Sequence, residues 1–201
     1  MKLKFSMWEQ GYICGAVTRS EGLRLAHLAA ETNEGCIVEL GSHSGSSAAW
    51  MAMGMQKSGN HRPLWCVDPW TDEAGERLAQ HAESAVRAMF DARMAFMASA
   101  GYIDPADVRP VQGYSTEVAV GWSEPVGLLH VDALHTYDAV RADVDAWAPH
   151  VVGKIVMHDW SVKRFGVRRV ADELRAEGWK VDGVHPGDRQ RGKHGQIVLS
   201  R

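Results

Sequence analysis

Short apolar runs alternate along the chain with longer stretches in which apolar residues recur every three or four positions. The short runs, bounded by turn residues, predict buried strands, and the longer spacing predicts helices that bury one face. The predicted strands are 36–40, 64–68, 108–113, 126–132, 154–159, 179–184 and 196–200. The predicted helices are 17–33, 46–56, 71–100, 137–148 and 167–177. Strands and helices therefore alternate until the last two strands, which have no helix between them.

This alternation predicts an α/β fold with a mostly parallel sheet covered by helices on both faces. The last two strands are joined by a short polar loop, so we expect them to be antiparallel. We expect one domain over residues 1–201, with an N-terminal helical segment at 1–34 and a doubly wound, Rossmann-like core at 35–201. Ligands of such sheets bind beyond the carboxyl ends of the strands, so the residues that follow each strand are the candidates for function.

The composition of the chain disfavours nucleic-acid binding, a membrane span, a disulfide framework and a zinc site. The 22 Lys and Arg residues are outnumbered by 25 Asp and Glu residues, and we find no basic groove for a nucleic acid. No apolar stretch has the length of a membrane span, and the N-terminal MKLKFSMWEQ lacks the apolar core of a signal peptide. Three cysteines without a C-x-x-C pair indicate neither a disulfide framework nor a zinc site. We therefore expect a cytoplasmic protein without nucleic-acid or membrane partners.

The turn after the first predicted strand, in IVELGSHSG, combines an acid with two glycines. Gly41 and Gly45 permit positive φ and close approach of the backbone to a ligand. His43 stands where a dinucleotide-binding G-x-G-x-x-G has its middle glycine, which counts against NAD or FAD. Glu39 at the end of a buried strand suits an ammonium or sulfonium ligand. The alternative is a simple Gly/Ser turn with Glu39 exposed.

Two further strand ends carry groups that suit a nucleoside. Asp68 ends the second predicted strand, where an acid can accept two hydrogen bonds from a ribose diol. Tyr114 and Ser115 follow the third strand and offer a ring and a hydroxyl near an adenine. For Trp70, core packing and a place in the pocket both stay open. The predicted ligand is S-adenosylmethionine, bound by Glu39, Gly41, Ser42, His43, Ser44, Gly45, Asp68, Trp70, Gly113, Tyr114, Ser115 and Asp132.

Five sequence blocks, in their order along the chain, resemble the class I S-adenosylmethionine-dependent methyltransferases: IVELGSHSGSSAAWMA, WCVDPW, VQGYSTE, LLHVDALHTYDAVRADVDAWAPHV and KIVMHDW. The resemblance is strongest to the small-molecule branch with macrocin-type sugar O-methyltransferases and cephalosporin-hydroxylase-like proteins. It covers about residues 17–165 and implies a seven-stranded sheet of order 3-2-1-4-5-7-6. It also implies the methionine end of the cofactor at Glu39, Gly41 and Gly45, the ribose at Asp68, and the adenine beside Tyr114 and Ser115.

The fourth and fifth predicted strand ends carry candidate catalytic groups. Methyl transfer requires that the acceptor be positioned and its proton removed. Asp132 and His135 are the predicted catalytic residues, and His135 is the general base if no metal binds, because the ordinary imidazole pKa lies near neutral pH.

Asp132, His158 and Asp159 are candidate ligands of a divalent ion, either Mg²⁺ or a softer metal. The resemblance implies paired acids at the fifth strand end, and His158 replaces the first of them. Metal-assisted and metal-free chemistry therefore both stay open, as does simple packing of His158 under Trp160.

The function that we expect is O-methylation of a small hydroxylated metabolite or sugar. An NAD-type oxidoreductase on the same sheet is disfavoured by His43 and Glu39. A cofactor-binding regulator without methyl transfer is disfavoured by the intact Asp132, His135 and Asp159. Methylation of a nucleic acid lacks both a basic groove and an Asn-Pro-Pro-aromatic motif. A homo-oligomer stays open. We expect the acids of the helix 137–148, which are Asp138, Asp143 and Asp145, on its solvated face.

Overall fold

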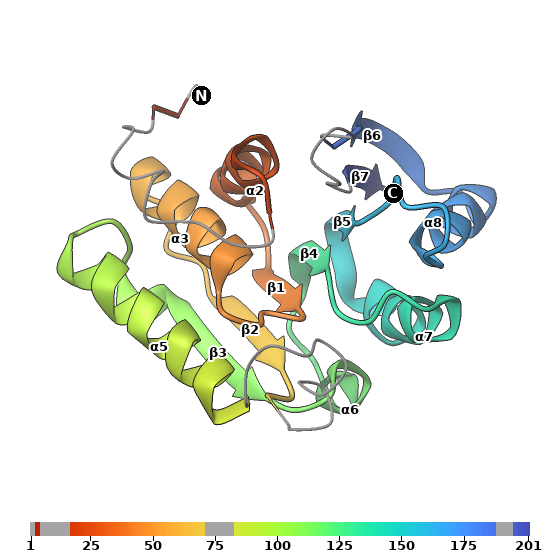
Figure 1. The fold of residues 1–201 in the computed structure, drawn as a ribbon. Helices are drawn as coiled ribbons and strands as arrows, with labels where there is room; N and C mark the ends of the chain where they lie inside the picture. Colours follow the sequence, from red (N-terminus) through yellow and green to blue (C-terminus); the bar gives the residue numbers. More distant parts are fainter. Residues whose placement is uncertain (1–2, 5–16, 71–82, 188–194) are drawn as a thin grey trace.

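The computed structural model describes residues 3–4, 17–70, 83–187 and 195–201. Seven strands form one sheet in the order β3-β2-β1-β4-β5-β7-β6 (Figure 1). They are β1 (Cys36–Leu40), β2 (Leu64–Asp68), β3 (Val108–Gln112), β4 (Val126–Val131), β5 (Val151–His158), β6 (Lys180–His185) and β7 (Gln196–Ser200). Strands β1 to β5 pair in parallel, and β7 is antiparallel to both β5 and β6. The predicted order and the antiparallel strand 7 are confirmed.

Helices cover both faces of the sheet (Figure 1). One face packs against α2 (Arg19–Glu31), α3 (Ser46–Ser58) and α5 (Glu83–Ser99), and the other against α6 (Ser115–Ala119), α7 (Tyr137–Trp147) and α8 (Val167–Ala176). Two 3₁₀ turns, Pro105–Asp107 and Ala148–His150, precede β3 and β5. None of the described helices is long and apolar enough to span a membrane.

Within the described residues each predicted strand and helix is found, with limits that differ by up to three residues, and one further helix is present. Helix α6 was not predicted, because five residues are too few to show a helical period. Much of the predicted helix 71–100 is found as α5, and its first part, 71–82, lies outside the described residues, as do residues 5–16 of the predicted N-terminal segment. The domain boundaries stay a prediction.

Helix α2 begins at a capping box formed by Thr18 and Glu21. The Thr18 hydroxyl accepts a hydrogen bond from the Glu21 N–H at 3.2 Å, and the Glu21 carboxylate accepts one from the Thr18 N–H at 2.8 Å. These bonds satisfy N–H groups that have no partner inside the helix. Unlike most capping acids, Glu21 is fully buried.

Helices α2 and α3 approach each other closely because glycine is present at their contacts. A Cβ atom at Gly22 would overlap the ring of Trp50, and one at Gly54 would overlap the carbonyl oxygen of Ala26. The close contact brings the start of α2 over the sheet, where Glu21 faces β5 and β7.

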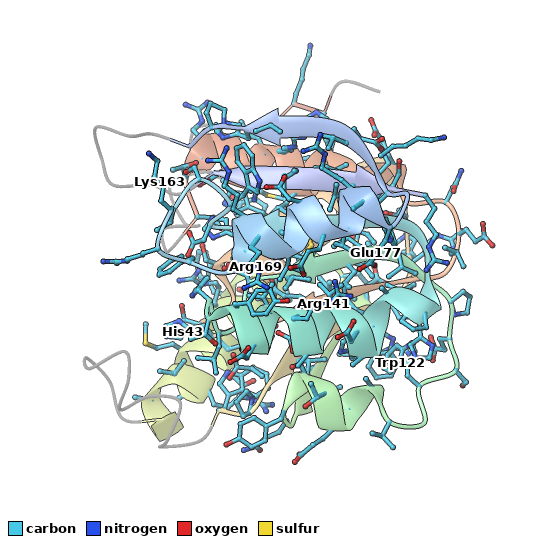
Figure 2. The ribbon with its side chains drawn as sticks, turned by 90° about the vertical axis from the view of Figure 1, so that its right-hand side faces the viewer. His43, Trp122, Arg141, Lys163, Arg169 and Glu177 are labelled. Carbon is cyan, nitrogen blue, oxygen red and sulfur yellow. The ribbon has the colours of Figure 1, made fainter. Side chains whose placement is uncertain are left out.

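Polar side chains link α7 to α8 on the opposite face (Figure 2). Arg141 donates to Glu177 at 3.0 Å, and the Arg169 guanidinium lies 3.7 Å from the centre of the Tyr137 ring. These two contacts hold α8 and the residue that follows it against α7.

The expectation for Asp143 was wrong. This side chain of α7 is only 4% exposed, and the hydroxyl of Ser115 donates to its carboxylate. The unpredicted helix α6 is the reason, because it begins at Ser115 and covers this side of α7.

Candidate functional site

The candidate residues lie at one edge of the sheet. Parallel pairing of β1 to β5 places the carboxyl ends of these strands together. Strand β7 runs the other way, so it begins at this edge, with Gln196 paired to His158 of β5. The structure thus brings the turn after β1 close to the groups that follow β2, β4 and β5.

The two glycines of the first turn adopt left-handed backbone conformations. Gly41 has φ of 88° and Gly45 has φ of 79°. A Cβ atom at Gly41 would overlap the carbonyl oxygen of Asp132, and one at Gly45 would lie 2.7 Å from the terminal methyl of Met94. The glycines are therefore required by the conformation of the turn and by its packing against β4 and α5.

Asp68 ties the first turn to the end of β2. Its two carboxylate oxygens each accept one backbone hydrogen bond of 2.8 Å, from the N–H of His43 and from the N–H of Trp70. Burial raises the pKa of Asp68, and these two bonds oppose the rise. Each oxygen keeps a lone pair, so the predicted contact with a ribose diol is compatible with this geometry.

Trp70 belongs to the core. It is buried, its ring meets the Phe90 ring edge-on at 5.2 Å, and its indole N–H donates to the carbonyl of His43 at 3.0 Å. Of the two alternatives for this residue, core packing is observed, and the indole N–H also holds the first turn in place.

Buried serine hydroxyls surround the start of α3. Ser42, Ser44 and Ser46 are buried, and the hydroxyls of Ser42 and Ser46 have no hydrogen-bond partner in the described part of the chain. Gly45 precedes the helix and provides no side-chain cap. Unpartnered hydroxyls at the N-terminus of a helix suit the carboxylate of a ligand.

Glu39 lies fully buried beside a histidine that the sequence analysis did not single out. Its Oε1 lies 3.2 Å from Nδ1 of His130, the residue opposite it on β4. Glu39 Oε2 and His130 Nε2 have no hydrogen bond within the described ranges. The free oxygen is available to a cationic ligand. His130 is the one polar residue within an otherwise apolar strand, and this was the signal that could have found it.

The groups after the third strand take different roles. The Gly113 N–H donates to the carbonyl of Asp68 at 3.1 Å. Tyr114 precedes α6 and is 43% exposed, whereas the Ser115 hydroxyl donates to the carboxylate of Asp143 in α7. Tyr114 is therefore free to border a ligand, and Ser115 mainly anchors α6.

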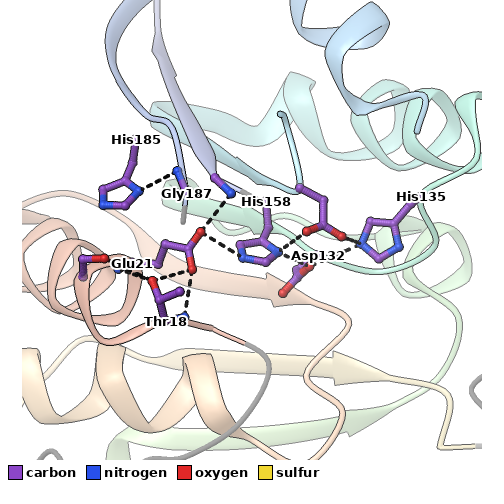
Figure 3. A network of polar contacts seen from close by, with 10 residues as sticks. Thr18, Glu21, Asp132, His135, His158, His185 and Gly187 are labelled. Atoms are coloured by element: carbon purple, nitrogen blue, oxygen red, sulfur yellow. Dashed lines mark hydrogen bonds and ion pairs between the residues drawn. The ribbon is translucent and has the colours of Figure 1, made fainter. Parts of the chain in front are cut away.

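Two carboxylates and two imidazoles converge after β4 and β5 (Figure 3). His158 Nδ1 lies 3.1 Å from Asp132 Oδ1 and 3.2 Å from Asp159 Oδ1. His135 Nε2 lies 2.9 Å from Asp159 Oδ2 and 3.5 Å from Asp132 Oδ1. The His135 ring stacks on Phe165 at 4.7 Å, which fixes its plane. The four candidate residues thus form one cluster.

The cluster is held by opposite charges. Burial raises the pKa of Asp132 and of Asp159, but the neighbouring imidazoles outweigh it and bring both pKa values below the usual range. Burial lowers the pKa of His135, but the two carboxylates outweigh it and raise this pKa to about 9. His135 therefore holds a proton at neutral pH in this state, unlike the ordinary imidazole assumed from the sequence.

The donor set fits a divalent metal. One ligand atom each from Asp132, His158 and Asp159 can be chosen so that all lie within 4.8 Å of one another. Two carboxylates with one imidazole suit Mn²⁺ or a similar transition metal. A site with oxygen ligands alone would suit these metals less well. The predicted ligands are thus brought together in a geometry that can hold the ion.

Glu21 reaches the cluster from α2, where it also forms the capping box with Thr18. Burial raises its pKa, but the nearby imidazole of His158 and the hydrogen bonds from Thr18 outweigh this and lower the pKa to about 2. Glu21 thus adds a buried negative charge behind His158. Sequence spacing gave no signal for this contact, because it arises from the packing of α2 on the sheet.

Solved structures with this fold include several methyltransferases. TomG of Streptomyces achromogenes, an O-methyltransferase solved in complex with SAM, is 17% identical, with a TM-score of 0.64 over 92% of this chain and 81% of TomG. The O-methyltransferase NovP is 16% identical, with a TM-score of 0.63 over 90% and 78% of the two chains. CalS11, a TDP-rhamnose 3′-O-methyltransferase, is 14% identical, with a TM-score of 0.61 over 90% and 78%.

Sequence comparison gives the family. No curated protein sequence matched the chain. The family model described as a methyltransferase domain matches residues 38–160, which span the first turn and the end of β5. The predicted recognition as a class I methyltransferase is confirmed by this match and by the strand order. The chain belongs to the methyltransferase-domain family.

Proposed function

We propose that the protein transfers a methyl group from S-adenosylmethionine to a hydroxyl of a small metabolite or sugar. Family membership supports methyl transfer. The O-methyltransferases NovP, CalS11 and TomG share the fold, and TomG was solved with SAM. The observation that carries the proposal is the convergence of Asp132, His135 and Asp159 at the sheet edge, beside the turn after β1.

The cofactor would lie along the ends of β1 to β3. Its carboxylate would meet the start of α3, where the hydroxyls of Ser42 and Ser46 lack partners. Its ammonium group would face the free oxygen of Glu39, its ribose diol the carboxylate of Asp68, and its adenine the exposed ring of Tyr114. Each contact joins groups of complementary charge or hydrogen-bonding capacity.

The chain's own groups prepare the acceptor. S-adenosylmethionine supplies a methyl group that is already activated by its sulfonium. His135 accepts the proton of the acceptor hydroxyl once it has lost its own, and Asp159 and Phe165 hold its ring in place. A divalent ion held by Asp132, His158 and Asp159 would orient the hydroxyl and lower its pKa.

Two measurements test the proposal. Calorimetry with S-adenosylhomocysteine should show binding, and NAD⁺ should not compete with it. Methyl transfer from labelled S-adenosylmethionine should then be detected within a panel of hydroxylated sugars and phenols. Competition by NAD⁺, or the absence of S-adenosylhomocysteine binding, would contradict the assignment. Binding without transfer to any acceptor would favour the regulator alternative instead.

A further inference from the structure

Glu21 and His158 form a contact between the start of α2 and the end of β5 (Figure 3). Glu21 Oε1 lies 3.7 Å from His158 Nε2. The other ring nitrogen, Nδ1, lies between Asp132 Oδ1 at 3.1 Å and Asp159 Oδ1 at 3.2 Å. The imidazole therefore spans the distance from a carboxylate on α2 to the two carboxylates of the cluster.

Glu21 is held rigidly in this position. Its Oε2 accepts hydrogen bonds from the N–H and the hydroxyl of Thr18, at 2.8 Å and 2.6 Å. Its Oε1 accepts the N–H of Gly195, just before β7, at 3.0 Å. A capping role accounts for the bonds to Thr18. It does not account for the second oxygen, which faces away from the helix start toward Gly195 and His158.

We propose that Glu21 is a positioning residue for a divalent metal site made by Asp132, His158 and Asp159. With the metal bound, the Nε2–H of His158 would face the carboxylate of Glu21, which lies 3.7 Å away, so that Nδ1 is the ring nitrogen presented to the metal. Metal-binding histidines commonly donate their second ring N–H to a carboxylate, which fixes the tautomer and the ring orientation. The inference rests on the proposed function, because it assigns a role within the same site.

A carboxylate at Glu21 explains how His158, in place of an acid, can serve as a metal ligand at the end of β5. An imidazole offers one ligand atom only if its other nitrogen carries the proton, and a buried carboxylate at Glu21 enforces that arrangement. An acid at position 158 would instead place its charge close to that of Glu21. The histidine and the buried acid are therefore expected to depend on each other.

The test is a set of Mn²⁺ titrations in which the electron paramagnetic resonance signal reports the concentration of free Mn²⁺. Glu21→Gln keeps the size of the side chain and an acceptor for Thr18, but its amide can donate to Nε2 and turn the proton of His158 to Nδ1. Mn²⁺ affinity is expected to fall by about 10- to 100-fold. Thr18→Ala is the matched control, because it removes two hydrogen bonds with Glu21, one to its carboxylate and one from its N–H, and leaves the carboxylate unchanged. It should keep Mn²⁺ affinity within about threefold.

A double variant separates positioning from general damage. In a His158→Asp background the imidazole is gone, so Glu21→Gln should weaken Mn²⁺ binding far less than it does in the wild type, because only the attraction of a nearby negative charge is lost. The proposal is overturned if the wild type does not bind Mn²⁺, if Glu21→Gln alone binds it as well as the wild type, or if the loss is equally large in the His158→Asp background. S-adenosylhomocysteine binding, measured on the same samples, reports separately on the proposed function.

Discussion

Asp143 provides a stability prediction that follows from its burial. The side chain lies inside the contact between α6 and α7 and receives one hydrogen bond, from Ser115. Burial raises its pKa from 3.8 to about 6, and the bond from Ser115 only partly opposes this. Replacing Asp143 with Asn removes the charge and keeps an oxygen that can accept the same hydrogen bond.

The sign and size of the effect follow from linkage. Because the pKa is raised in the folded state, the unfolded chain releases this proton first, and stability falls as pH rises from 3.8 through about 6. A difference of about two pKa units corresponds to about 3 kcal/mol once both states are ionised. Roughly half of this, about 1.4 kcal/mol, develops between about pH 5 and about pH 7.5.

The assay is urea unfolding of the wild type and of Asp143→Asn over this pH range. As pH rises, the free energy of unfolding of Asp143→Asn should increase by about 1.4 kcal/mol relative to that of the wild type. The other titrating groups are the same in both proteins, so their contributions cancel in this difference. Asp138→Asn, at an exposed position of the same helix, is the matched control and should show no such gain. The reasoning would be refuted if the difference in free energy of unfolding between Asp143→Asn and the wild type did not depend on pH, or if the wild type gained stability relative to the variant as pH rises.

Three further changes test the site and the packing. His135→Ala should lower turnover by about 10²- to 10⁴-fold while S-adenosylhomocysteine affinity stays within about twofold, and unchanged turnover would remove the base assignment. Asp68→Asn leaves one of two backbone N–H groups without its charged acceptor and should weaken S-adenosylhomocysteine binding by about tenfold in calorimetry. Gly54→Ala should cost about 1–3 kcal/mol in urea unfolding, because its Cβ would overlap the Ala26 carbonyl, and a gain from helix propensity would contradict this.

The strands could be read from the sequence because each is a short apolar run buried on both faces. The limits of β1, β2 and β7 match the predicted ones. Strand β5 begins earlier than predicted, at Val151, because Gly153 interrupts the apolar pattern there. The strand positions followed from local composition, whereas the short helix α6 depends on its contact with α7 and left no periodic signal.

The candidate cluster could be predicted for a topological reason. Parallel strands end at one edge of a sheet, so the residues after β4 and β5 lie close together whatever the identity of their side chains. Their protonation could not be predicted, because the raised pKa of His135 depends on two carboxylates at particular distances. The role of Glu21 was missed because it depends on the packing of α2 on the sheet, whereas His130 left a signal as the one polar residue of an apolar strand.

Buried polar side chains are concentrated on the face of the sheet that α2 and α3 cover. Glu39, His130, His158 and Gln196 come from four adjacent strands and are buried there, together with Glu21 of α2. With well-packed apolar residues at such positions, a protein would often be equally stable or more stable. A catalytic site needs charged groups that are already oriented before the substrate arrives, and burial provides that orientation. The closely packed helices α2 and α3 cover this face, so packing remote from the acceptor is expected to influence the geometry of the cluster.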